Sequence, residues 1–335
     1  MARYSIIIVL VLLLMGCGGK RYTHIPKDIE QVDVCIVRLD EDLLSLRADS
    51  AEVDMQRLMD AHSAFMPYYV ENILGLDASD IGEVSELYVQ FLQDTVMGFA
   101  QTHQEVKKQY SDIGGIEKEL TYGFSALHWL FPEWEIPTIY LFVSGFNASI
   151  VSCDDVIGVG VDMYLGSDYP YYNQVVYNYQ KTTMSKAYLA GDMLNYYIAQ
   201  HLPYMSKNNR LLEHMLYRGK QLYLLAQLLP VSPEWEVIGY TREQWEWCVD
   251  YETAIWNRIM DKRDLFKTDS RMMGSYLNDG PFTAEVSNES PGRLGIWVGW
   301  RIVDSYMRQN PEVTLQELMY DGAAQKILER RYYSP

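Results

Sequence analysis

The segment PTIYLFVSG at residues 137–145 decides the fold, together with NASIVS at 147–152 and VIGVGVDMYLG at 156–166. All three are rich in β-branched and aromatic residues, and turn-forming residues separate them, a composition typical of strands. Asp154 and Asp155 suit a tight hairpin turn between the second and the third segment. The middle of the chain is therefore predicted to form a small sheet.

A further strand is predicted for VDVCIVRLD at 32–40, where apolar side chains alternate toward one side before a helical pattern begins after Asp40. Gly158 and Gly160 leave one face of the last strand bare, which predicts that another element packs closely over it. The sheet should thus contain about four strands in mixed or antiparallel order.

The remainder of the chain has the spacing of amphipathic helices, because apolar residues recur three and four positions apart. Helices are predicted over about 51–66, 84–92, 105–130 with an interruption at 114–115, 184–200, 208–229, 241–261, 292–309, 314–319 and 323–330. Strands that are grouped, with helices on either side in sequence, indicate an α+β fold that is predominantly helical.

Gly295 and Gly299 within LGIWVGWRIV have the small-residue spacing that lets two helices approach closely. Arg293, Arg301 and Asp304 flank this segment too closely for a bilayer, so the spacing predicts tight helix packing in a protein core.

The N-terminus has the features of a bacterial lipoprotein signal. Arg3 precedes an apolar run from Ile6 to Leu14, and LMGC at 14–17 ends in a cysteine where a signal peptidase would cut. About ten apolar residues are too few to span a bilayer as a helix. We therefore expect a signal peptide over 1–16 and a mature chain that begins at a lipidated Cys17.

The domain organisation follows from composition. Residues 17–31 are polar with Gly, Lys and Pro and read as a flexible tether. The 48% apolar content of the chain can bury a large core. We expect a single domain over 32–335, with the sheet and its helices in 32–166 and a helical half in 167–335.

The charge and the cysteines limit location and partners. A net charge of −17 disfavours nucleic acid and anionic headgroups as partners. No acidic run follows Cys17, so the periplasmic face of the outer membrane is the expected location. Cys35, Cys153 and Cys248 allow at most one disulfide, either between Cys35 and Cys153 or none, with free thiols buried in the core.

The usual catalytic motifs are missing from the sequence. It contains no HExxH, no GxSxG, no P-loop and no GxGxxG at a strand-to-helix turn, and no cofactor is expected. One group of tyrosines after the last strand could form a ligand or peptide surface, although core packing is the alternative. These residues are Tyr169, Tyr171, Tyr172, Tyr177 and Tyr179.

Long, spaced segments of the chain resemble the gliding-motility-associated lipoprotein GldB family. The segments are GVGVDMYLG at 158–166, LLEHMLYRGKQLYLLAQLLP at 211–230, IGYTREQWEWCVDYETAIW at 238–256, DGPFT at 279–283, SPGRLGIWVGWRIVDSYM at 290–307 and ILERRYYSP at 327–335. The resemblance implies a membrane-anchored periplasmic accessory of the gliding machinery, which is linked to type IX protein secretion, with protein partners in that apparatus.

The same C-terminal pattern is similar to that of zinc peptidases that carry HExxH. Here the corresponding helix reads AGDMLNYYIAQHLP at 190–203, and Arg218-Gly219 stands where that family has a glutamate before glycine. A guanidinium cannot ligate zinc. The resemblance therefore implies a degenerate, gluzincin-like scaffold without a metal or catalytic residues.

On this interpretation Arg218 and Lys220 lie near the former metal cleft, where they either pair with Asp192, Glu213 or Glu252 or hold a carboxylate. An edge-strand groove could also bind an extended peptide, with Tyr171 and Tyr172 as contacts. The alternative from another class is a peptidase with a non-standard zinc site around His201, Glu213 and His214.

Overall fold

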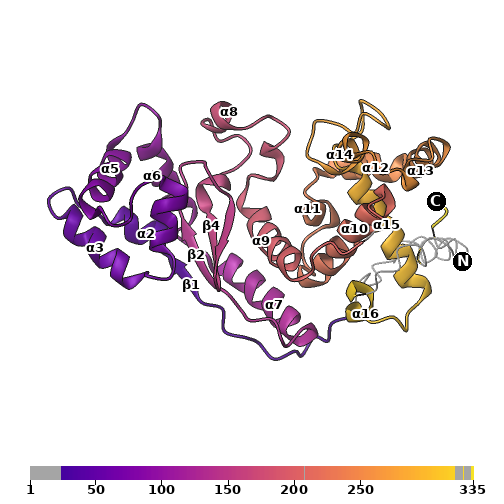
Figure 1. The fold of residues 1–335 in the computed structure, drawn as a ribbon, viewed down its shortest axis with the longest axis horizontal. Helices are drawn as coiled ribbons and strands as arrows, with labels where there is room; N and C mark the ends of the chain where they lie inside the picture. Colours follow the sequence, from indigo (N-terminus) through magenta and orange to yellow (C-terminus); the bar gives the residue numbers. More distant parts are fainter. Residues whose placement is uncertain (1–23, 207, 321–326, 328–332) are drawn as a thin grey trace, which may run out of the picture.

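The computed structural model describes residues 24–206, 208–320, 327 and 333–335 and places a four-stranded sheet between groups of helices (Figure 1). The strands are β1 (Ile36–Arg38), β2 (Thr138–Phe142), β3 (Ile150–Cys153) and β4 (Val156–Gly160). Their order across the sheet is β1-β2-β4-β3. β2 is parallel to β1 and β4, and β3 is antiparallel to β4, so the predicted mixed sheet is confirmed.

The hairpin between β3 and β4 closes at the predicted turn. Cys153 pairs with Val156, and Asp154 takes a left-handed φ of 47°, which aspartate tolerates in tight turns. The prediction for 32–40 was too long, because β1 covers only Ile36–Arg38; of the residues before it, Cys35 still contacts β2, where its carbonyl accepts from the Ile139 N–H at 2.9 Å. The Val32 N–H instead donates to the Ser125 hydroxyl at 3.0 Å.

One face of the sheet is covered by helices from the N-terminal part of the chain (Figure 1). These elements are α2 (Leu39–Leu44), α3 (Ala51–Ala61), α4 (Met66–Tyr68), a π-helical turn at Tyr69–Leu74, and α5 (Ile81–Gln93). Phe65 lies over Gly158, where an added Cβ would come within 2.5 Å of the phenyl ring. The bare strand face predicted from that glycine is therefore filled by an aromatic side chain.

The other face of the sheet belongs to the main core, to which α7 (Gly114–Leu130) and α9 (Lys186–His201) contribute, whereas α6 (Phe99–Gln109) packs beside α2 and α5 and adds Val106 to this core (Figure 1). The interruption predicted at 114–115 falls at the start of α7, because α6 has already ended at Gln109. Side chains of β2 alternate between the two faces, with Tyr140 and Phe142 on one and Ile139 and Leu141 on the other.

The C-terminal half is helical, as predicted (Figure 1). Its helices are α8 (Tyr172–Val175), α10 (Leu211–Leu228), α11 (Glu234–Ile238), α12 (Arg242–Asp250), α13 (Glu252–Asp261), α14 (Ser270–Leu277), α15 (Leu294–Gln309) and α16 (Leu315–Tyr320). In the described part of this half, 3-10 turns lie at Lys181–Thr183 and Asp264–Phe266, and another directly follows β4 at Val161–Met163. The helix predicted over 241–261 divides at Tyr251 into α12 and α13, and most of the helix predicted over 323–330 lies outside the described residues.

α10 and α15 cross in direct backbone contact, which confirms the packing predicted from the glycine spacing. An added Cβ at Gly299 would lie 1.9 Å from the Met215 carbonyl oxygen, and one at Gly219 would lie 2.3 Å from the Gly299 carbonyl carbon. Gly295 packs against Tyr276 of α14 instead. Only a residue without a side chain fits at the crossing.

Several expectations concern the N-terminus and the cysteines. The signal peptide over 1–16 and Cys17 lie outside the described residues. The end of the expected tether is packed, because Ile25 and Ile29 contact the main core. Cys35 and Cys153 are free and lie near opposite edges of the sheet, with β2 and β4 between them, so the alternative of a disulfide between them is wrong. Of the three free thiols in the described residues, Cys248 is buried as expected, whereas Cys35 is exposed. Among the described helices, none has both the length and the apolar character needed to cross a membrane.

Candidate binding pocket

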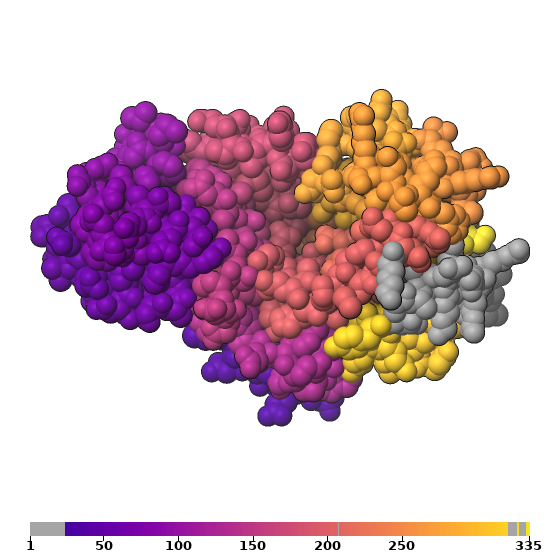
Figure 2. Space-filling view, in the orientation of Figure 1, coloured from indigo at the N-terminus to yellow at the C-terminus, as the bar shows by residue number. Residues whose placement is uncertain are grey.

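A cavity of about 280 Å³ lies between the sheet and the C-terminal helices. Its walls come from α9 and α10, from the loop at 176–184, from the turn after α11 and from the start of α15. Figure 2 shows the surface hollowed between the pink segment after the sheet and the orange C-terminal helices. The site therefore uses segments that are far apart in the sequence.

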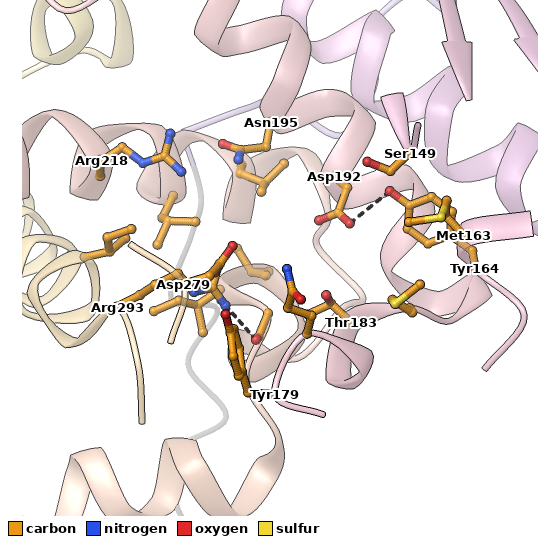
Figure 3. Close-up of a pocket in the computed structure, with 18 of the residues that line it drawn as sticks. Ser149, Met163, Tyr164, Tyr179, Thr183, Asp192, Asn195, Arg218, Asp279 and Arg293 are labelled. Atoms are coloured by element: carbon orange, nitrogen blue, oxygen red, sulfur yellow. Dashed lines mark hydrogen bonds and ion pairs between the residues drawn. The ribbon is translucent and has the colours of Figure 1, made fainter. Parts of the chain in front are cut away.

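Arg218 enters this cavity from α10 (Figure 3). The contact of Gly219 with Gly299 fixes the rotation of α10, and so it fixes the direction of the neighbouring arginine. Burial lowers the pKa of Arg218 from its usual value, and the positive charge of Arg293 acts in the same direction. A guanidinium nevertheless stays charged at any physiological pH.

Arg218 makes no hydrogen bond or ion pair within the described part of the chain. The predicted pairing of Arg218 with Asp192, Glu213 or Glu252 is therefore wrong. Glu252 pairs with Arg301 at 2.7 Å, and Glu213 accepts the Arg210 N–H at 3.2 Å at the start of α10.

Asp192 and Asn195 reach the cavity from α9, three residues apart and hence on one side of the helix (Figure 3). The Tyr164 hydroxyl donates to Asp192 at 3.1 Å. Burial raises the pKa of Asp192 to about 6, although the hydrogen bond from Tyr164 and the charge of Arg293 oppose this shift. The Asn195 side-chain oxygen is buried and has no partner among the described residues.

Arg293 lies across the cavity, and its contacts differ from those of Arg218. It pairs with Asp279 at 3.1 Å and donates to the Gly239 carbonyl at 2.9 Å. Arg293 directly precedes α15 and has a left-handed φ of 56°. The close contact of Gly292 with the Gly280 backbone brings together the loop that carries Asp279 and the loop that carries Arg293. Arg293 therefore has a structural partner.

The tyrosine-rich loop forms one wall, and its members have different roles. Tyr172 is a core residue with no exposed surface, and its hydroxyl donates to the Asp162 carbonyl at 2.7 Å, so the predicted contact surface is wrong at this position. Tyr171 is half-buried, packs against Gly98 and does not line the cavity. Tyr179 does line it, and Tyr177 stacks on the Tyr179 ring with centroids 5.7 Å apart.

Comparison with known proteins matches residues 22–335 to the family described as gliding motility protein GldB. The chain belongs to the GldB family. No curated protein and no solved structure matches it. Membership makes the chain a gliding-motility-related lipoprotein, and such a lipoprotein associates with a membrane through its lipid.

The residues of this GldB-family chain that could hold a metal are dispersed. Within the described ranges no three His, Cys, Asp or Glu side chains form a group that could bind a metal ion. The His201 ring packs at a tilt against the Tyr197 ring, and the His214 ring stacks on the Tyr204 ring, each pair with centroids 4.1 Å apart. The alternative zinc site at His201, Glu213 and His214 is therefore not formed, and nothing supports a gluzincin-like scaffold.

Two other predicted site residues of the GldB-family chain lie away from the cavity. Lys220 is buried on α10, two residues beyond Arg218, and does not line the pocket. Glu252 accepts the Tyr333 hydroxyl at 2.8 Å in addition to its pair with Arg301, in a shallower site near the C-terminus.

Sequence reasoning missed Asn195, Tyr164, Asp279 and Arg293 as residues of this pocket. A signal existed for Asn195, because it stands three residues after Asp192 in an otherwise mainly apolar segment of α9. Asp279 and Arg293 meet only through the folding of separate loops, and no spacing in the sequence indicates that contact.

Proposed function

We propose that this chain is a non-enzymatic accessory of the gliding-motility and type IX secretion machinery, and that it acts by binding a partner in the pocket. An acyl group on Cys17 would hold it in the outer membrane, with the folded body in the periplasm. Membership of the GldB family supports the connection to motility.

One observation carries the preference for binding over chemistry. Arg218 puts a fixed positive charge without a partner among the described residues into the cavity, whose lining includes no histidine and no cysteine. A partly buried charge without an ion pair lowers stability, and such a cost is expected where a ligand supplies the pairing group.

The anchor is tested in a gliding host from which the gene has been deleted. We expect the Cys17→Ser variant to lose incorporation of labelled palmitate, to leave the outer-membrane fraction and to fail to restore gliding or type IX secretion. Cys35→Ser removes an exposed cysteine of the folded body and should restore all of these. A Cys17→Ser protein that is still acylated, or that supports gliding, would contradict the proposal.

The absence of catalysis is tested in the same strain with Asp192→Asn. The Asp192 carboxyl, whose pKa is raised to about 6, is the group in this pocket best suited to general acid–base catalysis. Asparagine keeps its size and an oxygen that accepts from Tyr164. Normal gliding of this strain is the expected result. Loss of gliding, with the protein present at normal abundance and its crosslinked partners in cells unchanged, would indicate an enzyme.

A further inference from the structure

The pocket has an unsatisfied donor group and an unsatisfied acceptor. Arg218 offers several N–H donors and a positive charge, and the buried Asn195 oxygen lacks a donor within the described residues (Figure 3). Leaving buried polar groups unpaired costs free energy, so a complementary ligand is stabilised by the groups that it satisfies.

A guanidinium binds carboxylates well, because two parallel N–H groups match two carboxylate oxygens. The Asn195 oxygen accepts a hydrogen bond, which an N–H group on the same ligand would donate. A carboxylate with a neighbouring N–H is the chemistry of the last residue of a polypeptide, where the peptide N–H is two bonds from the carboxylate carbon.

One part of the remaining wall is apolar and fits a small apolar side chain. Leu222 and Leu225 from α10 and Ile296 from α15 line the cavity beside Arg218. A volume of about 280 Å³ is close to the lower end of the roughly 300–1,000 Å³ range of ligand pockets. It suits one or two residues and excludes a long folded segment.

The opening of the pocket provides contacts for residues that precede the terminal one. Tyr177 is 72% exposed and stacks on Tyr179 of the cavity wall, so an aromatic surface continues outward. Lys181 holds this loop in place through the side-chain oxygens of Asn173 and Asn178. Rigid exposed tyrosines bind peptides at a low entropic cost.

We propose that the pocket binds the free C-terminus of a peptide, with Arg218 on the terminal carboxylate and the Asn195 oxygen on the last peptide N–H. This assignment rests on the proposed binding role and specifies its ligand class.

The test uses the full chain in detergent, immobilised and exposed to an equal mixture of two randomised pentapeptide pools. One pool ends in a free carboxylate, and the other is amidated and isotopically labelled, so mass spectrometry measures the ratio retained. We expect at least tenfold enrichment of the carboxylate pool, since a charge-assisted bidentate pair is lost on amidation.

Arg218→Gln should abolish the enrichment, and Arg271→Gln, on the exposed surface of α14, should preserve it. Asn195→Asp provides a second variant if Arg218→Gln fails to fold, because a third carboxylate in the cavity, after those of Asp192 and Asp279, adds to the repulsion of the peptide carboxylate. Its enrichment should fall severalfold while its circular dichroism spectrum stays unchanged.

Equal retention of both pools, or enrichment that persists in Arg218→Gln, would overturn the ligand assignment. Displacement of the peptides by free amino acids at equal concentration would overturn it as well, because the site would then recognise a free metabolite. If the pools show no difference while the Cys17→Ser strain still fails to glide, the ligand class is wrong and the accessory role stands.

Discussion

Arg218 shows how a single residue can serve binding at the expense of stability. Its guanidinium is partly removed from water and makes no hydrogen bond or ion pair within the described residues, so the folded state carries a desolvation cost that the charge of Asp279 offsets only in part.

We therefore predict that Arg218→Met stabilises the protein in the absence of ligand. Methionine keeps most of the side-chain volume and removes the charge, so the free energy of unfolding should rise by about 1–3 kcal/mol. Urea denaturation followed by circular dichroism measures the change. Arg308→Met is the control, because Arg308 pairs with Asp304 and should not stabilise when removed. A destabilised Arg218→Met would mean that the guanidinium has a partner in the folded chain.

Asp192 leads to a prediction about pH. Burial raises its pKa from 3.8 to about 6 in the folded state, so folding favours the protonated form. Its stabilising effect is complete below pH 3.8 and is lost as the pH rises through about 6. Tyr164, Arg293 and Asp279 are the polar and charged groups that act on this carboxyl.

Asp192→Asn removes this dependence. At pH 8 the variant should be more stable than the wild type by on the order of 2 kcal/mol, and the difference should vanish toward pH 4. Thermal unfolding at several pH values measures it, with Asp250→Asn on the exposed end of α12 as the control. A difference that is constant with pH would show that Asp192 is not the titrating group.

At the scale of elements, the crossing of α10 and α15 determines where the pocket is. Gly219 and Gly299 allow backbone contact between these helices, and this contact sets the rotation of α10 that directs Arg218 into the cavity. The two helices thus act as one rigid unit that carries part of the binding surface.

Gly299→Ala should separate the helices. The new methyl group would lie 1.9 Å from the Met215 carbonyl oxygen, which belongs to the backbone and cannot rotate away. We therefore expect the free energy of unfolding to fall by about 3 kcal/mol or more. Gly115→Ala, in the first turn of α7, meets no atom within 4 Å and should change stability by less than about 1 kcal/mol, in the stabilising direction. Chemical denaturation of both variants checks the contrast, and equal stabilities would mean that the crossing is looser than described.

At the scale of the whole molecule, the sheet joins two hydrophobic clusters. Phe65 belongs to the cluster under the N-terminal helices, and its ring lies 4.9 Å from that of Tyr140 on β2. Ile139 and Leu141 of the same strand belong to the main core. Loss of one cluster therefore weakens the strand on which the other depends.

We predict that Phe65→Ala lowers the stability of the entire molecule by about 3–5 kcal/mol. All eight tryptophans lie at residue 129 or later, so their fluorescence reports on the end of α7, on the segment that follows it and on the C-terminal half. Tryptophan fluorescence and circular dichroism should show the same lowered midpoint. Val53→Ala, exposed on α3, is the control. An early transition by circular dichroism with an unshifted fluorescence midpoint would show that the two clusters unfold separately.

The sequence by itself determined the strand segments, the hairpin turn at Asp154, the helical C-terminal half and the tight packing at Gly299. These features depend on residues that are close together in the sequence, because hydrophobic periodicity and turn formation are local properties. Only the tertiary structure decided that Arg218 has no partner among the described residues, that Asp192 and Asn195 share its cavity, and that Tyr172 is core. Pairing and burial depend on which distant segments meet, and no local pattern encodes that.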